Sequence, residues 1–238
     1  HIDRFLIGAI VSVGAVTYYA TCSEIVVKLL IFPRAWVSVL FPTFAGHFDR
    51  QQGQTSDLFA RSLTWLLSIL FPVILLVIAF APEGFQLWLG SDFAETSTPV
   101  MRWLTAGVFV YCLTYIPFSF LQGIGRPNIT AIIHLIEFPL FVILAVFMIQ
   151  RLGIVGAAMA WTLRAVLELA VMLFCAKRFA PVISRYAVRW LIAGGAALVM
   201  AAGIGLCESF LWRLPGVAAG LLAWAALVWF YLFADEDR

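Results

Sequence analysis

Charged residues are scarce in this sequence. Asp, Glu, Lys and Arg make up only 12% of the 238 residues, whereas 63% are hydrophobic and the mean hydropathy is +1.01. A soluble globule needs far more polar side chains to cover its surface. The composition therefore excludes a soluble domain and indicates a membrane protein.

The sequence also lacks the patterns of several other protein classes. The formal net charge is only +2, and no run of Lys and Arg is long enough for a polybasic anchor, so we expect no nucleic-acid partner. The cysteines stand far apart, without CxxC or His spacing, and indicate neither a metal site nor a redox motif. They are Cys22, Cys112, Cys175 and Cys207. We accordingly expect no metal and no cofactor.

An initiator Met and a signal peptide are missing as well. The chain starts at His1 and enters an apolar segment at once, with no basic n-region and no small-residue cleavage site. We interpret the sequence as a fragment of a longer protein.

Long apolar runs dominate what remains. A helix needs about 20 mostly apolar residues to cross a bilayer, because it rises about 1.5 Å per residue across about 30 Å. The runs do not alternate polar and apolar residues as barrel strands do, so they predict helices. About eight segments qualify or nearly qualify: 2–20, 25–45, 62–81, 100–121, 129–149, 154–176, 190–206 and 214–234.

The polar joints between these segments differ in charge. The joint after the third segment is acidic, with Glu83, Asp92 and Glu95. The joints after the second, fourth and sixth segments are basic, with Arg50, Arg61, Arg126, Lys177, Arg178, Arg185 and Arg189. The positive-inside rule places the basic joints and both ends of the chain in the cytoplasm.

Prolines interrupt several predicted spans, at Pro33, Pro42, Pro72, Pro117 and Pro139. Each proline removes an amide donor and frees a carbonyl, which lipid cannot satisfy. Broken helices are frequent where transporters bind or bend, although a single proline can equally be a packing kink.

The first segment carries charge at its start. Asp3 and Arg4 begin the helix, and Arg4, Gly8 and Ser12 are spaced to share one face. Two interpretations of Arg4 stay open. Its side chain either snorkels to the interface or provides a cation at the mouth of a cavity.

The second segment carries more cations. Glu24 and Lys28 have the i, i+4 spacing of an intrahelical ion pair, which lowers the cost of burying either group. Arg34 follows Pro33 and has no acid three or four residues away. A guanidinium matches two phosphate oxygens at once, so Arg34 is the better candidate for binding an anion.

The fifth and sixth segments hide charge near their middles. His134 and Glu137 follow Thr130 at helical spacing in one segment, and Arg164 and Glu168 lie four apart in the next. An ionisable group at the bilayer centre costs about 2.5–3.5 kcal/mol unless it has a partner or a cavity. We expect these groups to meet across the turn, either as a packing network or as a site where Glu137 shares a proton with His134.

Several stretches resemble the bacterial oligosaccharide flippases, often called Wzx-type, of the multidrug/oligosaccharidyl-lipid/polysaccharide flippase superfamily. They are DRFLIGAIVSVGAVTYYAT, EIVVKLLIFPRAWVSVLFPTFA, QGIGRPNITAIIHLIEFPLFV and GIVGAAMAWTLRAVLE. The resemblance implies an all-α polytopic membrane fold with about eight transmembrane helices. Residues 1–180 would form the second six-helix lobe of a MATE-like flippase and residues 181–238 two additional helices with a short cytoplasmic tail. The N-terminal lobe would be missing.

The resemblance also implies a function. The intact protein would flip a polyprenyl-pyrophosphate-linked oligosaccharide across the bacterial inner membrane by alternating access, for O-antigen or exopolysaccharide biosynthesis, with coupling to H⁺ or Na⁺. Its partners would be this lipid-linked glycan, the bilayer, the missing lobe and the polysaccharide polymerase machinery. Candidate pyrophosphate-binding residues are Arg4, Lys28 and Arg34. Candidates for ion coupling or a polar network are Asp3, Glu24, His134, Glu137, Arg164 and Glu168, and candidates for sugar stacking are Tyr18, Tyr19 and Trp36.

Other functions remain open at this point. A flippase for a lipid-linked peptidoglycan precursor or a multidrug/cation antiporter would have the same fold, but a cation exporter needs an excess of acid in its cavity. A membrane glycan ligase or polymerase would use a long outward loop with catalytic Arg, His or Glu. The longest outward joint, 82–99, contains neither Arg nor His.

Overall fold

The computed structural model describes residues 2–47, 52–179, 183–206 and 210–229, and these ranges contain helices and no strand. The helices are α1 (Ile2–Ile10), α2 (Val13–Val27), the 3₁₀ turn η1 (Lys28–Leu30), α3 (Ile31–His47), α4 (Gln52–Leu89), α5 (Ser91–Gly123), α6 (Pro127–Ala176), α7 (Ile183–Leu206) and α8 (Phe210–Leu227). Within these ranges, four helical stretches are long and apolar enough to cross a membrane, and α7 and α8 contain shorter apolar helices. The predicted all-α polytopic membrane fold is confirmed.

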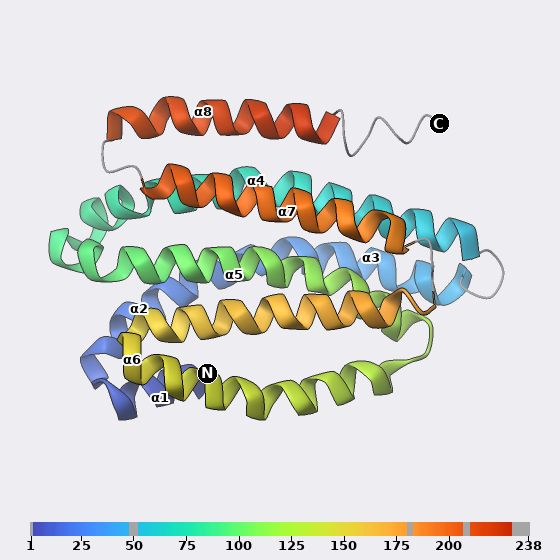
Figure 1. Ribbon diagram of the computed structural model, residues 1–238, viewed down its shortest axis with the longest axis horizontal. Coiled ribbons are helices and arrows are strands. Elements are labelled where there is room, and N and C mark those ends of the chain that lie inside the picture. Colours follow the sequence, from blue (N-terminus) through green and yellow to red (C-terminus); the bar gives the residue numbers. More distant parts are fainter. Residues whose placement is uncertain (1, 48–51, 180–182, 207–209, 230–238) are drawn as a thin grey trace.

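Helix α5 is the centre of the bundle (Figure 1). It contacts α2, α3, α4, α6 and α7, and 78% of its apolar stretch is buried. Phe120 shows how this packing is achieved, because its ring meets Phe44 of α3 and Phe59 of α4 edge to face, with centroids 5.6 and 5.5 Å away. The other helices are positioned by their contacts with this one.

Helix α6 is a hairpin that reverses at Gly153 (Figure 1). Gly153 has φ +59° and ψ −138°, a conformation that strains any residue with a Cβ. A Cβ at Gly156 would clash with the backbone carbonyl of Met148, so glycine is also required for the close approach of the two halves. Residues 127–152 and 154–176 correspond to the two spans predicted there, joined by the expected short turn.

The first two predicted spans are wrong in their boundaries. We expected helices over 2–20 and 25–45, but α1 ends at Ile10 and a continuous helical run then extends from Val13 to His47. Ser12 is extended, and its hydroxyl accepts a hydrogen bond from the Ala15 amide at 3.0 Å, so it caps α2. Ser12 therefore does not continue the helical face of Arg4 and Gly8.

Four of the five prolines do not end the helices that contain them. Pro42, Pro72, Pro117 and Pro139 all lie inside α-helices. Only the stretch before Pro33 tightens, into η1, because a proline ring clashes with the carbonyl four residues earlier, here that of Leu29. The irregular backbone begins at Lys28 and ends shortly before Arg34.

The predicted acidic joint at 82–99 is also different from expectation. Helix α4 continues to Leu89 and α5 begins at Ser91, so Gly90, with φ +91°, is the only residue between them. Polar composition alone suggested a loop, but the residues around Glu83 and Asp92 extend the two helices instead. The connection between α4 and α5 is thus a sharp corner.

Helices α7 and α8 pack on one side of the bundle, against α4 (Figure 1). The indole of Trp190 donates to the Thr64 hydroxyl at 3.3 Å. Arg213 of α8 donates to Glu83 of α4 at 2.5 Å and to the Ala79 carbonyl at 3.3 Å. The predicted tail after residue 229, Cys207 and the side chains of Arg50, Arg185 and Arg189 lie outside the described residues.

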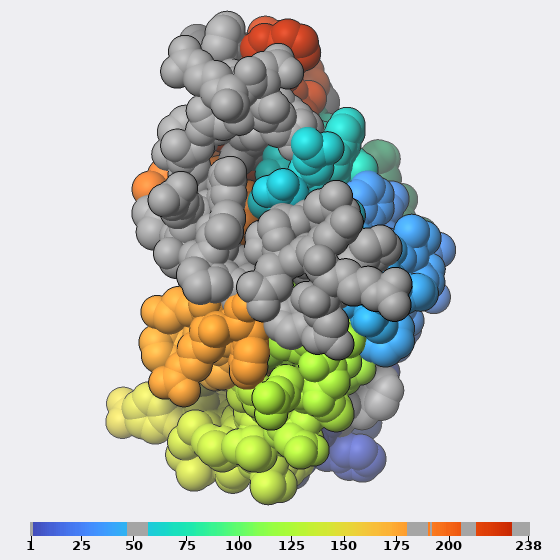
Figure 2. All heavy atoms as spheres, turned by 90° about the vertical axis from the view of Figure 1, so that its right-hand side faces the viewer, coloured from blue at the N-terminus to red at the C-terminus, as the bar shows by residue number. Residues whose placement is uncertain are grey.

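The basic joints gather at one end of the bundle. The end of α3, the start of α4, the α5–α6 turn and the end of α6 all lie at the right of Figure 1, and Figure 2 faces this end. Arg61, Arg126, Lys177 and Arg178 belong to these segments, whereas Asp92 and Glu95 lie at the opposite end. The charge asymmetry inferred from the sequence is therefore an asymmetry of the folded molecule.

Candidate functional site

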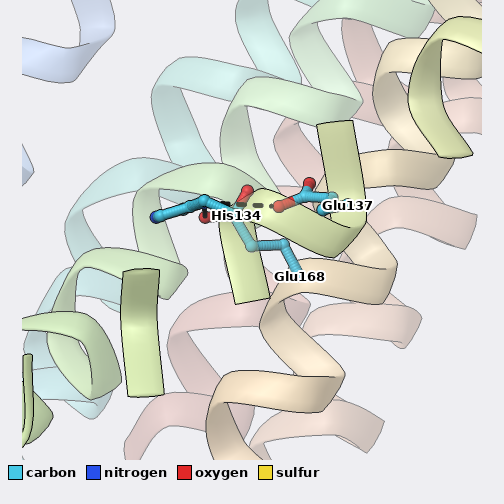
Figure 3. Close-up of side chains that lie close together, drawn as sticks. All are labelled: His134, Glu137 and Glu168. Carbon is cyan, nitrogen blue, oxygen red and sulfur yellow. Dashed lines mark hydrogen bonds and ion pairs between the residues drawn. The ribbon is translucent and has the colours of Figure 1, made fainter. Parts of the chain in front are cut away.

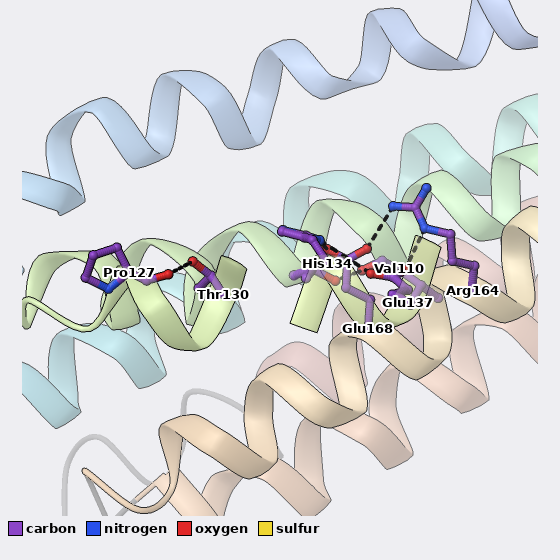
Figure 4. A network of polar contacts seen from close by, with 8 residues as sticks. Val110, Pro127, Thr130, His134, Glu137, Arg164 and Glu168 are labelled. Carbon is purple, nitrogen blue, oxygen red and sulfur yellow. Dashed lines mark hydrogen bonds and ion pairs between the residues drawn. The ribbon is translucent and has the colours of Figure 1, made fainter. Parts of the chain in front are cut away.

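Four ionisable side chains meet inside the α6 hairpin (Figures 3 and 4). Arg164 donates through Nε to Glu137 Oε1 at 2.6 Å and through Nη2 to Glu168 Oε2 at 3.1 Å. His134 Nδ1 lies 3.4 Å from Glu137 Oε2 and 3.9 Å from Glu168 Oε1. We call His134, Glu137, Arg164 and Glu168 the hairpin cluster.

The members of the hairpin cluster differ in exposure. The side chain of Glu168 is 2% exposed and that of Glu137 13%, whereas that of His134 is 43% exposed. Arg164 lies over the rings of Tyr111 and Phe141, 5.9 and 5.5 Å from their centroids. His134 is therefore the most exposed member of the cluster, and it lies next to two largely buried carboxylates.

The charges of the hairpin cluster do not balance without a proton. Two carboxylates share one guanidinium, so the cluster carries one net negative charge when His134 is neutral. One proton, on His134 or on a carboxylate, makes it neutral. Groups coupled this closely bind that proton as a unit rather than as single residues.

The same oxygens and the His134 ring have the spacing of a metal site, with ligand atoms within 4.8 Å of one another. Arg164 already donates to both carboxylates, however, and a metal ion would have to displace it. Thr130 is not part of this network, because its hydroxyl donates to the Pro127 carbonyl at 2.8 Å (Figure 4). The arrangement suits a proton better than a metal.

A second polar group joins α1 to α2. Arg4 donates to Glu24 Oε1 at 2.6 Å, and the Asp3 carboxylate accepts from the buried Tyr19 hydroxyl at 2.6 Å. The close partner of Glu24 is thus a cation from another helix rather than Lys28, which acts on Glu24 only as a nearby charge. Arg4 is partly neutralised and is a weaker anion ligand than its sequence position suggested.

Lys28 and Arg34 are the exposed cations of this surface. Neither forms an ion pair with an acid anywhere in the ranges that the structure describes. Arg34 lies beside the Tyr115 hydroxyl of α5. Both residues lie well inside the 34-residue candidate span Val13–Gly46. Two cations without an acid at membrane depth do not face lipid, so this surface borders water or another part of the protein.

Comparison of the spans supports this conclusion. The apolar stretch of α6 has a mean hydropathy of 2.6 and is only 17% buried, as expected for a helix that faces lipid. The span Val13–Gly46 is similarly exposed, with 22% buried, but its mean hydropathy is only 1.7. An exposed and less apolar span is expected to line a polar path or a partner surface rather than lipid.

The predicted sugar-stacking aromatics are mostly packing residues. Tyr19 is fully buried, Tyr18 packs on Phe93 with ring centroids 4.9 Å apart, and Trp36 is partly buried against the core. Tyr111 and Tyr115 of α5 form a different aromatic group, which was not predicted from the single segments. Their i, i+4 spacing on a helix next to the charged hairpin was the available signal.

A second group of charged residues, Glu83, Arg102 and Arg213, was also not predicted from the sequence. Arg102 of α5 donates through Nε to the Ile78 carbonyl at 3.3 Å, close to Glu83 and Arg213. The three residues come from three different helices. In the sequence, Glu83 is only one of the charges of the acidic joint; in the structure its ion pair with Arg213 holds α8 to the bundle.

A polytopic helical bundle with charged groups at membrane depth has the architecture of a membrane transporter. The family model described as "Lipid II flippase MurJ" matches residues 2–223. The chain therefore belongs to this flippase family, and the predicted membership of the flippase superfamily is confirmed.

Individual relatives agree with this assignment. The "Putative O-antigen transporter" of Shigella flexneri is 30% identical over 168 residues, which cover 71% of this chain and 40% of that protein. The "Probable low-salt glycan biosynthesis flippase Agl15" of Haloferax volcanii is 26% identical over 162 residues, which cover 68% of this chain and 34% of that protein. The matches thus span less than half of these curated relatives.

A solved structure shares the fold. "Lipid II flippase MurJ, inward closed conformation" superposes with a TM-score of 0.70, over all of this chain and 52% of that chain. The sequence identity is 15%, so the likeness concerns the fold alone. By their names, these relatives are flippases and transporters rather than enzymes.

Proposed function

We propose that the protein flips a polyprenyl-pyrophosphate-linked oligosaccharide from the cytoplasmic to the outer leaflet of the bacterial inner membrane. The observation that carries this proposal is the pair of exposed cations, Lys28 and Arg34, on a membrane span next to the 3₁₀ turn η1. A pyrophosphate needs positive charge where the dielectric is low, and irregular backbone at that depth is common in transporter binding sites.

The two parts of the chain would serve this function differently. In our proposal, residues 1–180 form one lobe of an alternating-access transporter and residues 181–238 add two helices to it. The surface with Lys28 and Arg34 faces a polar path shared with a second lobe, while the apolar outer surface of α6 faces lipid. The basic end of the bundle lies in the cytoplasm, as the positive-inside rule requires.

The hairpin cluster would bind and release the coupling ion. We favour H⁺ over Na⁺, because Arg164 already holds both carboxylates and leaves the cluster one proton short of neutrality. His134 is its exposed member and would pass the proton between the polar path and Glu137. Binding and release of this proton would favour different states of the lobe.

A lipid-linked peptidoglycan precursor is the second candidate substrate, since the matching family model is described as a Lipid II flippase. It presents the same polyprenyl-pyrophosphate chemistry to Lys28 and Arg34. A cation antiporter fits less well, because the exposed Asp, Glu, Lys and Arg residues of α2, η1 and α3 are Glu24, Lys28 and Arg34, with an excess of base. A glycan ligase or polymerase lacks an outward catalytic loop here, since α4 and α5 are separated only by Gly90.

Transport by the intact protein tests the proposal. The protein is reconstituted in vesicles with polyprenyl-pyrophosphate-linked glycan, and a membrane-impermeant reagent measures the glycan that reaches the opposite leaflet. Lys28→Gln and Arg34→Gln are each expected to slow transport by about tenfold to hundredfold, because each removes a charge-assisted contact to phosphate.

Arg151→Gln is the matched control. Arg151 is an exposed arginine of α6 that lies over the Phe147 ring, 5.6 Å from its centroid, and plays no part in the proposed site. Its loss is expected to leave transport unchanged. Normal glycan transport by the Lys28→Gln/Arg34→Gln double variant contradicts the proposed anion site. Faster transport of an organic cation than of the glycan contradicts the proposed function.

A further inference from the structure

A small polar cavity lies between α5 and the hairpin cluster. Its volume is about 130 Å³, and it is lined by Tyr111, Thr114, Tyr115, Phe118, His134 and Glu168. A separate, nearly apolar cavity of about 290 Å³ lies between the halves of α6 and also reaches Glu137, Arg164 and Glu168. The smaller cavity therefore combines aromatic walls with the exposed member of the cluster.

The walls of the smaller cavity are held in place. Tyr111 packs edge to face on Tyr115 and Trp161, with ring centroids 5.5 and 5.7 Å apart, and Arg164 lies over its ring. The Phe118 and His134 rings are 6.1 Å apart. The Thr114 hydroxyl donates to the Val110 carbonyl at 3.3 Å. The cavity is thus a preformed site, as ligand pockets usually are.

The polar groups at the cavity come from two directions. Tyr115 places its hydroxyl near that of Tyr111 and beside the Arg34 guanidinium of α3. His134 and a carboxylate oxygen of Glu168 lie on the other side. A ligand in this cavity would therefore meet aromatic faces, hydrogen-bonding groups around its rim and, next to Tyr115, a cation without a carboxylate partner among the described residues.

A sugar ring has matching chemistry. Its C–H faces are apolar, and its hydroxyls form a polar rim that both donates and accepts hydrogen bonds. Aromatic walls with a few placed polar groups suit such a ligand. A volume of 130 Å³ is well below the roughly 300–1,000 Å³ of pockets for drug-sized ligands, so the cavity admits one ring rather than an oligosaccharide.

We propose that this cavity binds the first sugar of the lipid-linked glycan, the one bonded directly to the pyrophosphate, and that Tyr115 determines which sugar is accepted. The inference rests on the proposed function, because it assumes that Arg34 binds the pyrophosphate. Arg34 and Tyr115 are neighbours, so a phosphate on Arg34 leaves its attached sugar at the mouth of the cavity. Sugars further along the glycan extend away from it.

Equilibrium binding to the purified intact protein tests this subsite. The probes are three synthetic polyprenyl diphosphates, carrying glucose, N-acetylglucosamine or no sugar. Quenching of tryptophan fluorescence reports occupancy, because Trp161 packs directly on Tyr111. At least one sugar probe is expected to bind about tenfold more tightly than the sugar-free probe, a typical effect of one well-packed aromatic contact.

Three variants separate binding of the sugar from binding of the phosphate. Tyr115→Ala is expected to remove the advantage of the sugar probe and leave the Kd of the sugar-free probe unchanged. Lys28→Gln is expected to weaken all three probes by a similar factor. Tyr115→Phe, which keeps the ring and removes the hydroxyl, is expected to retain part of the advantage, and it covers the case in which the alanine variant fails to fold.

The outcomes distinguish this inference from the proposed function. Equal binding of all three probes by the unaltered protein overturns the sugar subsite, even if vesicles still show glycan transport. Loss of sugar-free binding in both Tyr115→Ala and Tyr115→Phe also overturns it, since Tyr115 would then support the phosphate site. Selective sugar binding without any transport supports the subsite and contradicts the proposed function.

Discussion

Replacing Arg164 by glutamine tests the hairpin cluster most directly. The change keeps a polar but shorter and uncharged side chain and removes the guanidinium that Glu137 and Glu168 share. It leaves two carboxylates close together, and the Glu168 side chain is only 2% exposed. His134 would remain as their only cationic neighbour in the cluster.

The contacts give the expected size of the effect. Arg164 makes charge-assisted hydrogen bonds of 2.6 and 3.1 Å to the two acids, and such bonds contribute about 1.5–3 kcal/mol each. Breaking a buried ion pair by removing one partner costs about 3–5 kcal/mol, because an uncompensated charge stays behind. The two bonds together give about 3–6 kcal/mol and the broken pair about 3–5 kcal/mol, so either route predicts the loss of a large part of a typical folding free energy.

Thermal unfolding of the intact protein in detergent measures this loss. Arg164→Gln is expected to lower the midpoint strongly, and Arg164→Gln/Glu168→Gln is expected to recover much of it. The double variant leaves Glu137 with His134, which can balance each other. Arg151→Gln, an exposed arginine on the same hairpin, is expected to change stability by less than about 0.5 kcal/mol.

Two results would refute this reasoning. If Arg164→Gln unfolds at the same temperature as the unaltered protein, the ion pairs contribute nothing to the hairpin. If the double variant is less stable than Arg164→Gln, the cost does not come from uncompensated negative charge. In that case the stacking of Arg164 on Tyr111 and Phe141 would be its main role.

Three further changes follow from other contacts. Gly107→Ala is expected to cost about 1–3 kcal/mol of stability in the same unfolding assay, because the new Cβ would lie 2.7 Å from Thr162 Oγ1. Gly195→Ala is expected to be neutral, because a Cβ there would have no atom within 4 Å. Arg213→Leu is expected to loosen α8 and expose it to protease, because it leaves Glu83 unpaired. Adding Glu83→Leu is expected to restore protection. Unchanged digestion of the single variant would contradict this. Glu137→Gln is expected to remove the acceleration of glycan transport by a pH gradient and to spare transport without a gradient; an acceleration that survives would exclude Glu137 from coupling.

The sequence alone determined the fold class and the hairpin. Scarce charge, long apolar runs and the absence of alternation require helices in a membrane, because lipid satisfies no backbone polar group. Within the hairpin, the i, i+4 spacing of Arg164 and Glu168 and the short turn at Gly153 were sufficient to predict that these groups meet Glu137. Both constraints are local, so they can be read from the order of residues.

Only the tertiary structure decided what the charged and aromatic side chains outside the hairpin contact. Glu24 and Lys28 have ideal spacing for a pair, yet Glu24 binds Arg4, because α1 turns back at Ser12 and brings a second cation to the same acid. The burial of Tyr19 and the opening beside Tyr115 likewise depend on which face of a helix meets its neighbour. Spacing within a helix fixes which residues share a face, but packing between helices decides what that face touches. For this protein, that packing determined that Arg4 pairs with Glu24, whereas Lys28 and Arg34 stay exposed.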